Sequence, residues 1–377
     1  MGISCFQENG YTSLKSQFNN KTLLIGLKAN KKLTELNSIL QCLCHIEPLV
    51  DYYKYEFDKI KEKESYKLYH KKDLSLSDSF RQVIDKIWPD GASKRKKENP
   101  QYFQITDSYE FLEMIYLINP NYNENQEYLL NFILTRLHKE LIISENNNDI
   151  FLSETNKDTA LSNYNQNNPK ENRTKIDELF FGKYYTNLFC NNCNNNFYIF
   201  QPYIYGSYSL DQVYNYKNQT CQNGINELYN TNMINLNINE INIYDCLYYE
   251  KQMKNTNQLC RKCAIMTECR FQNIIHSSSK IITFIFNKNI SLQNFFFSYE
   301  EKINIDLFVE EKNGKFFDLI GIIYSPYPNN YISYCKSPID NKWYSYEDQK
   351  VEIKNNCQEI FQNIGFPYIL FYQISES

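Results

Sequence analysis

The sequence has no run of apolar residues long enough to cross a bilayer. Its most apolar segment, KIITFIFNKNI, is interrupted by Lys288, whereas a spanning helix needs about 20 apolar residues. The opening MGISCFQENGYTSLK lacks the apolar core of a secretory signal and does not resemble an Arg-rich transit peptide. It also carries Phe6 where a myristoylation signal has Ser or Thr. We therefore expect a soluble or peripheral protein.

Basic charge is also scarce. The 40 Lys and Arg are outnumbered by 44 Asp and Glu, so the formal net charge is −4. Nucleic-acid-binding proteins neutralise phosphates with a broad basic face, and we therefore expect no direct contact with nucleic acid. The one basic cluster, Lys94–Lys97, is either an import or anionic-partner patch or a solvated loop, and we favour the loop.

Aromatic residues and cysteines are plentiful by contrast. With 33 Tyr, 25 Phe and 42% hydrophobic residues, the chain can bury a large core, which excludes general disorder. Twelve cysteines in a chain without a secretory signal indicate reduced thiols in an intracellular, reducing compartment. We therefore expect paired CxxC elements to bind metal rather than form disulfides.

The chain changes character along its length. The run NSILQCLCHIEPLVDYYKY, residues 37–55, has helical spacing up to Pro48 and then a turn and a second helical start. Another helix is expected to begin near Thr106, in ITDSYEFLEMIYLI. Residues 144–173 are polar and Asn-rich, which predicts an insertion or a flexible loop.

The C-terminal half consists of short aromatic and β-branched runs that predict strands. They are NFYIFQPYIYGSYSL, KIITFIFNK, KINIDLFVEE, FDLIGIIYS, NNYISYCK, KWYSYED and PYILFYQIS. A helical N-terminal part followed by a strand-rich part predicts an α+β protein with an antiparallel sheet.

Two CxxC pairs are the most specific spacing signal. CNNC places Cys190 and Cys193 together, and CRKC places Cys260 and Cys263 together. Four thiolates suit a closed tetrahedral zinc site, which is structural because it leaves no open position for substrate. The alternative is four unrelated buried cysteines, and we favour zinc.

Five segments, in order, resemble the ubiquitin-specific protease family. They are GLKANKKLTELNSILQCLCHIEPLVDYY, ITDSYEFL, LFFGKYYTNLFCNNC, NNYISYCKSPIDNKWYSYEDQKV and PYILFYQ. The family's corresponding boxes are GLxNLGNTCYxNSxLQCLxHxxPLxxYF, QQDAxEFL, LFxGxxxSxxxCxxC, GHYxAYxKxxxxxxWYxFDDxxV and AYxLFYxR. The resemblance covers about Gly26 to Ser375.

The resemblance implies a papain-like cysteine-protease fold with a helical thumb, an antiparallel-sheet palm and zinc-ribbon fingers. The expected boundaries follow the boxes. An N-terminal extension spans 1–25, and the protease-like domain spans 26–375. Within it, the thumb is 26–140, the Asn-rich insertion 141–178, the fingers 179–269 and the palm 270–375.

The same alignment places unsuitable residues at the family's catalytic positions. The nucleophilic cysteine falls on Thr34 and the histidine base on Asn330. The residue that orients the histidine falls on Glu347, and the oxyanion-stabilising asparagine falls on Ala29. The family's glycines in GNT and GHY fall on Lys31 and Asn329, which adds bulk where a Gly-Gly tail would pass. We therefore predict a pseudoenzyme.

Other residues could be suspected of replacing the lost groups. Thr34 is internal, whereas threonine nucleophiles usually use their own terminal amine as base. Cys42, Cys44 and His45 lie on or near one helix, and their ordinary interpretation is packing. The remaining histidines, at positions 70, 138 and 276, have no carboxylate or cysteine motif beside them.

Asp107 and Glu110, in DSYEFL, match family residues along the groove for the ubiquitin tail. Their carboxylates could bind a basic tail, or Asp107 could stabilise the start of a helix. Three functions stay open: a scaffold subunit of a larger protein assembly, which we prefer, a non-catalytic ubiquitin-binding protein, and a deubiquitinating hydrolase with an altered site.

Overall fold

The computed structural model divides into two compact units. Unit 1 comprises residues 1–140 and 327–363, and unit 2 comprises 141–326 and 364–377. The residues that the structure describes are 24–29, 34–62, 75–89, 104–120, 126–142, 153–168, 173–222, 240–287, 295–327, 330–354, 360 and 367–375. The basic cluster at 94–97, and residues 2, 5, 6, 31, 70 and 329, lie outside them.

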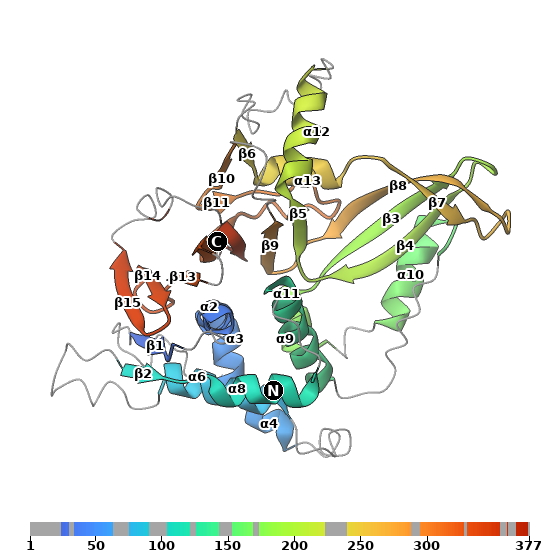
Figure 1. Cartoon of the computed structure of the whole chain (residues 1–377). Coiled ribbons are helices and arrows are strands. Elements are labelled where there is room, and N and C mark those ends of the chain that lie inside the picture. The colour runs from blue at the N-terminus through green and yellow to red at the C-terminus, as the bar shows by residue number, and fades with distance from the viewer. Residues whose placement is uncertain are drawn as a thin grey trace, which may run out of the picture. The chain divides into compact units, whose positions relative to one another are not determined.

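Unit 1 is mainly helical (Figure 1). Its helices are α2 (Thr34–Leu43), α3 (Glu47–Asp51), the π-helical turn η1 (Tyr52–Glu56), α4 (Phe57–Lys61), α6 (Leu76–Ile87), α8 (Tyr109–Ile118) and α9 (Gln126–Leu141). Pro48 stands at the start of α3, where its missing N–H costs no hydrogen bond. The predicted helix, turn and second helix over 37–55 are thus confirmed.

Three consecutive antiparallel strands also belong to unit 1. They are β13 (Asn330–Lys336), β14 (Trp343–Glu347) and β15 (Lys350–Lys354), in the order β15-β14-β13. Helix α2 is buried against β13 and β14. Two short strands, β1 (Ile25–Leu27) and β2 (Gln104–Thr106), pair in parallel beside it. The segment predicted as a helix from Thr106 therefore begins as a strand, and α8 starts at Tyr109.

The described residues of unit 2 form two larger sets of paired strands and one two-stranded sheet. One runs β12-β16-β9-β5, from β12 (Phe317–Tyr327), β16 (Pro367–Ile374), β9 (Ile281–Asn287) and β5 (Gly206–Ser209), with β11 (Lys302–Ile303) on β12. Its β5 pairs in parallel with β9, which departs from a purely antiparallel sheet. The segment KINIDLFVEE was predicted as one strand, but only its first residues form β11. Separately, β6 (Glu240–Asn242) pairs in parallel with β10 (Phe296–Ser298).

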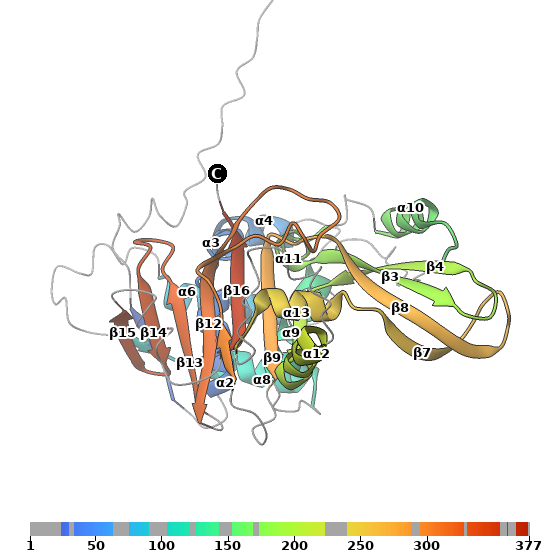
Figure 2. The same ribbon diagram turned by 90° about the horizontal axis from the view of Figure 1, so that it is seen from above.

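The second sheet of unit 2 is a long antiparallel one in the order β4-β3-β8-β7 (Figure 2). Its strands are β3 (Gly182–Cys190), β4 (Asn196–Tyr203), β7 (Lys254–Leu259) and β8 (Met266–Ser277). The β3–β4 and β7–β8 connections are tight turns at the same end of the sheet, because β3 and β8 are antiparallel and pair in continuous register from Tyr184 to Cys190. Each turn carries one CxxC motif.

The Asn-rich segment does not remain a loop over its whole length. Residues 157–167 form α10 (Lys157–Asn167), which the prediction of a flexible loop over 144–173 missed. Asn156 caps the helix, since its side chain accepts a hydrogen bond from the amide of Thr159 at 3.0 Å. Ala160 and Tyr164 then pack on Phe200 in β4. Packing on β4 therefore stabilises a helix that the polar composition of the segment did not predict.

Three further helices complete unit 2: α11 (Lys175–Phe180), α12 (Leu210–Gln222) and α13 (Ile243–Glu250). With helices and largely antiparallel sheets in separate runs of the chain, the predicted α+β class is confirmed. Among the described residues, no helix combines the length and apolarity that a membrane span requires.

Candidate functional site

The residue aligned with the family's nucleophile faces a carboxylate. Thr34 is the first residue of α2, and its Oγ1 donates a hydrogen bond to Oδ2 of Asp348 at 3.3 Å. Asn37, one turn further along the helix, donates from Nδ2 to Oδ1 of Asp348 at 2.7 Å. An anion beside the first turn of a helix is stabilised by the helix dipole. Asp348 therefore places its own negative charge at the start of α2.

Asp348 is held there by the turn between β14 and β15. Its backbone has a φ of 50°, a left-handed conformation that Asp tolerates better than most residues. Its carbonyl accepts from the amide of Leu27 in β1 at 3.0 Å. A Cβ on Gly26 would lie 2.9 Å from that carbonyl and 2.5 Å from the carbonyl of Gln349, so glycine is required for this approach.

The other aligned positions lie around the same turn. Asn330, at the start of β13, donates from Nδ2 to Oε1 of Glu347 at 3.2 Å. Sequence alignment gave Glu347 the role of orienting the residue at position 330, and these two side chains are in contact. Asp348, the residue that contacts Thr34, was not named by the sequence interpretation. Its signal was the adjacent carboxylate in WYSYED. Ala29 is exposed and presents no polar side-chain donor.

The electrostatics of this carboxylate are mixed. Burial raises the pKa of Asp348 above its ordinary value, and the neighbouring charge of Glu347 raises it further. Hydrogen bonds from Asn37 and Thr34 act in the opposite direction. A threonine hydroxyl is a far weaker acid than a carboxyl group, so a single carboxylate makes a poor base for it.

A second group of thiols and an imidazole lies in the core of unit 1. The Sγ atoms of Cys42 in α2 and Cys335 in β13 are 3.7 Å apart. Burial raises the pKa of Cys335, but the hydrogen bond with Cys42 and the nearby ring of His45 lower it to about 6. His45 bonds the hydroxyl of Tyr346 through Nε2 at 2.9 Å and the carbonyl of Gln41 through Nδ1 at 2.7 Å.

This buried group does not form an accessible catalytic site. Cys335, Cys42 and His45 are 0%, 3% and 5% exposed, so a substrate amide cannot reach the sulfur. His45 is separated from Thr34 by the length of α2, about 15 Å. The interpretation of Cys42 and His45 as packing residues is consistent with this burial.

Asp107 and Glu110 are exposed at the start of α8. Lys86 in α6 pairs with both, at 3.7 Å from Oδ1 of Asp107 and 3.1 Å from Oε2 of Glu110. Asp107 is not the N-cap of α8. That position belongs to Ser108, whose hydroxyl instead donates to Oδ1 of Asn37 at 2.6 Å.

The four predicted metal ligands meet in unit 2. The Sγ atoms of Cys190, Cys193, Cys260 and Cys263 all lie within 4.8 Å of one another. Two of the separations are 3.9 Å, between Cys190 and Cys263, and 3.7 Å, between Cys193 and Cys260. In a tetrahedral zinc–thiolate site with Zn–S bonds of about 2.3 Å, neighbouring sulfurs are about 3.8 Å apart. The cluster therefore has the dimensions to bind a metal such as zinc.

The two CxxC turns share one backbone geometry. The residue after each motif, Asn194 and Ala264, has a φ of 55° and 56°. Its amide donates to the carbonyl of the first cysteine, Cys190 at 2.9 Å and Cys260 at 2.8 Å. This repeated turn directs both thiols of each motif to the same point.

Neighbouring side chains and amides form hydrogen bonds with the sulfurs of the cluster. The side chain of Asn195 lowers the pKa of Cys193 to about 6 against the effect of desolvation. Asn192 donates from Nδ2 to Sγ of Cys263 at 3.3 Å, and the amide of Cys263 donates to Sγ of Cys260 at 3.4 Å. Such donors stabilise thiolates and orient metal ligands.

The sequence and the fold are both similar to those of known proteins. The sequence model of a family described as ubiquitin carboxyl-terminal hydrolase matches residues 25–372. A chain of the yeast SAGA DUB module is 15% identical, with a TM-score of 0.62 over 96% of this chain and 70% of that chain. No curated protein matches the sequence.

Two other solved structures are similarly related. A chain of the SAGA Ubp8/Sgf11/Sus1/Sgf73 DUB module bound to ubiquitin aldehyde is 16% identical, with a TM-score of 0.59 over 96% of this chain and 70% of that chain. A chain of the module bound to monoubiquitin is 16% identical, with a TM-score of 0.59 over 98% and 72%. At these identities the likeness establishes the fold, and the predicted fold is confirmed.

Proposed function

Because the chain belongs to the ubiquitin carboxyl-terminal hydrolase family, we propose that it is a non-catalytic member that acts by binding proteins. The observation that carries the proposal is the contact at the start of α2. There a threonine takes the nucleophile's place, and its hydroxyl bonds the Asp348 carboxylate at 3.3 Å. A family cysteine at that place works as a thiolate activated by an imidazole.

The other losses act on the same reaction. The Asn330 amide, which takes the place of the histidine, cannot accept and return a proton near neutral pH. Its Nδ2 is moreover committed to Glu347. Ala29 supplies no side-chain donor for an oxyanion, and one such donor is worth about 100- to 1,000-fold in rate. A nucleophile restored alone would still lack its base and its electrostatic support.

We propose that the protein serves as a scaffold subunit of a larger assembly. The matched SAGA structures are of modules that contain several different proteins, so the fold has precedent as a subunit. Unit 2 also offers exposed apolar side chains for a partner. Leu259, Ile265 and Met266 are 56%, 53% and 65% exposed around the CRKC turn. Exposed apolar clusters of this kind mark protein-interaction sites.

A second candidate is a non-catalytic ubiquitin-binding protein. It is favoured by an exposed strip in unit 1 where Ile105 and Tyr109, 53% and 50% exposed, flank Asp107. Carboxylates beside apolar side chains could bind a basic tail. Lys86 already neutralises Asp107 and Glu110, however, which weakens this site for a cationic ligand.

Two measurements separate these candidates. Affinity purification with mass spectrometry should return the chain with a stable set of partner subunits if it is a scaffold. Titration of labelled ubiquitin should give no saturation up to millimolar concentrations. Saturable micromolar binding that tightens in Lys86→Gln, which frees Asp107 and Glu110, would favour the ubiquitin receptor instead.

We also propose that the four cysteines hold one structural zinc ion. The sulfur separations of 3.7 and 3.9 Å and the matching backbone turns support this assignment. A shell of four thiolates leaves no position for substrate, so the metal would stabilise the β4-β3-β8-β7 sheet rather than take part in chemistry.

A further inference from the structure

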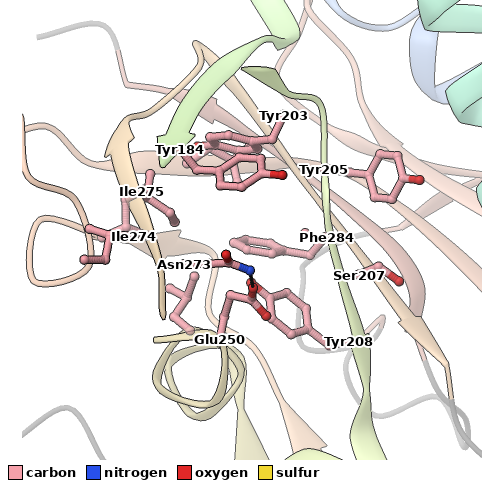
Figure 3. A pocket seen from close by; sticks show the side chains of 14 residues that line it. Tyr184, Tyr203, Tyr205, Ser207, Tyr208, Glu250, Asn273, Ile274, Ile275 and Phe284 are labelled. Carbon is pink, nitrogen blue, oxygen red and sulfur yellow. Dashed lines mark hydrogen bonds between the residues drawn. The ribbon is translucent and has the colours of Figure 1, made fainter. Parts of the chain in front are cut away.

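Unit 2 contains a cavity that none of the roles above uses. It has a volume of about 240 Å³ and lies among β3, β5, β8, β9 and α13 (Figure 3). Its walls include four tyrosines and Phe284, and Glu250 is the one charged residue among the described residues that line it. Ligand pockets for drug-sized molecules are larger, about 300–1,000 Å³. The cavity therefore suits a small group, of the size of one side-chain end.

Two close backbone approaches fix the aromatic walls. A Cβ on Gly182 would lie 2.4 Å from the ring of Tyr203, and a Cβ on Gly206 would lie 2.8 Å from the ring of Tyr208. Both rings therefore lie directly on a glycine, in the space that a Cβ would occupy, so a larger residue at either glycine would move the ring.

The rings form pairs around the cavity. The centroids of Tyr184 and Tyr203 are 6.3 Å apart, with their planes at 59°. Those of Tyr208 and Phe284 are also 6.3 Å apart, at 43°. In Figure 3, Tyr184 and Tyr203 lie together on one side of the cavity, while Tyr208 and Glu250 lie on the opposite side.

Several polar groups of the cavity are already committed. Asn273 donates from Nδ2 to Oε1 of Glu250 at 2.7 Å, which holds the carboxylate at the wall, and its Oδ1 accepts from Thr186 at 2.8 Å. Lys254 lies 3.4 Å from the other carboxylate oxygen. The hydroxyl of Tyr184 donates to Gln201. These contacts reduce the number of acceptors for a ligand that brings several N–H groups.

Glu250 brings a carboxylate to the cavity wall, and Lys254 at 3.4 Å offsets part of its charge. Burial raises the pKa of Tyr184, and the charge of Glu250 raises it further. The faces of tyrosine and phenylalanine rings add negative quadrupole potential. An apolar cation is therefore stabilised, whereas a strongly hydrated ion would lose its water shell without replacement.

We propose that this cavity binds a methylated ammonium group, with the ring faces of Tyr184, Tyr203 and Tyr208 around its methyl groups and Glu250 as counter-ion. A quaternary ammonium has no N–H to satisfy and spreads its charge over methyl groups that contact aromatic faces. The ligand is either a free trimethylammonium compound or the methylated lysine of a protein partner, since both present the same group.

Ligand-observed NMR titration of the full chain tests the site with choline and with its neutral isostere, 3,3-dimethylbutanol. We expect saturable choline binding that is about tenfold tighter than binding of the alcohol, because the two differ only in charge. A peptide with trimethyllysine, against the same peptide unmodified, distinguishes the two sources. Tighter binding of the methylated peptide than of choline indicates a protein partner, and the reverse indicates a small molecule.

Variants complete the experiment. Glu250→Gln keeps the shape and an acceptor for Asn273 but removes the charge, and should weaken choline binding about fivefold or more. Glu268→Gln, an exposed carboxylate of β8 outside the cavity, is the matched control and should leave binding unchanged. Thermal unfolding of both variants verifies folding. Equal affinity for choline and the alcohol, no saturable choline binding, or equal binding by Glu250→Gln would overturn the proposal.

Discussion

Replacing Asp348 by Ala, Gly and Asn should destabilise unit 1 by three different amounts. Each change removes the carboxylate that accepts from Asn37 at 2.7 Å and from Thr34 at 3.3 Å. The three residues also differ in how they tolerate a φ of 50°. Gly adopts this conformation freely, Asn tolerates it, and Ala is strained there. The series therefore separates the side-chain contacts from the backbone conformation.

The magnitudes follow from the geometry. Hydrogen bonds to a charged group contribute about 1.5–3 kcal/mol each when buried. Because Asp348 is half-buried and its contact with Thr34 is long, we take about 2 kcal/mol for the pair. The left-handed conformation costs Ala about 1 kcal/mol relative to Gly. We expect losses of about 2.5 kcal/mol for Asp348→Ala, 1.5 for Asp348→Gly and 1 for Asp348→Asn.

Tryptophan fluorescence during urea unfolding measures this series selectively. The chain has two Trp, and both Trp88 and Trp343 are buried in unit 1. Their signal therefore reports unfolding of the unit that contains Asp348. A loss of 2 kcal/mol moves the urea midpoint by about 1 M at a slope near 2 kcal/mol/M. Equal stability of the Ala and Gly variants would mean that the left-handed conformation at position 348 costs Ala nothing. No change in any variant would mean that the carboxylate contacts do not stabilise unit 1.

Three other perturbations test separate parts of the structure. Metal analysis should find one zinc per chain, and Cys193→Ser or a chelator should release it and lower the melting temperature; carefully purified, stable protein with less than one zinc would contradict the assignment. Glu140→Gln should lower the stability of unit 1 by about 2 kcal/mol by the same fluorescence assay, because this buried carboxylate accepts from two amides at the start of α6 at 2.8 and 3.0 Å. Burial raises the pKa of Glu310, but Lys157 and other partners lower it below its ordinary 4.5, so its contribution is present above that value and is lost as pH falls through the lowered pKa. Because Glu310 pairs with Lys157 at the start of α10, protease cleavage in α10 should increase as pH falls below about 4.5. At neutral pH, cleavage should be faster in Glu310→Gln than in the unchanged protein.

The sequence predicted those parts of the fold in which local pattern and tertiary environment agree. Helical spacing with Pro48 identified α2 and α3. Short aromatic and β-branched runs identified β9, β12, β13, β14 and β16. The CxxC pairs were informative because a tetrahedral metal site requires four thiols at one point, and the registers of β3 and β8 bring the two turns together.

Other features depend on contacts that no local pattern encodes. Helix α10 is polar over most of its surface, and its order rests on Ala160 and Tyr164 packing on the β4-β3-β8-β7 sheet. Alignment named Glu347 and gave no role to Asp348, the carboxylate that contacts Thr34 and Asn37 in α2. The left-handed turn at Asp348 points that side chain at Thr34 and leaves Glu347 to Asn330.

Turnover of a fluorogenic ubiquitin conjugate by the purified, zinc-loaded chain tests the absence of hydrolytic activity most directly. We expect a rate equal to the uncatalysed background, unchanged in Thr34→Ala, while an active family member measured in parallel releases the fluorophore. Turnover above background that disappears in Thr34→Ala would contradict the absence of activity, because Thr34 would then act as a nucleophile activated by a nearby base.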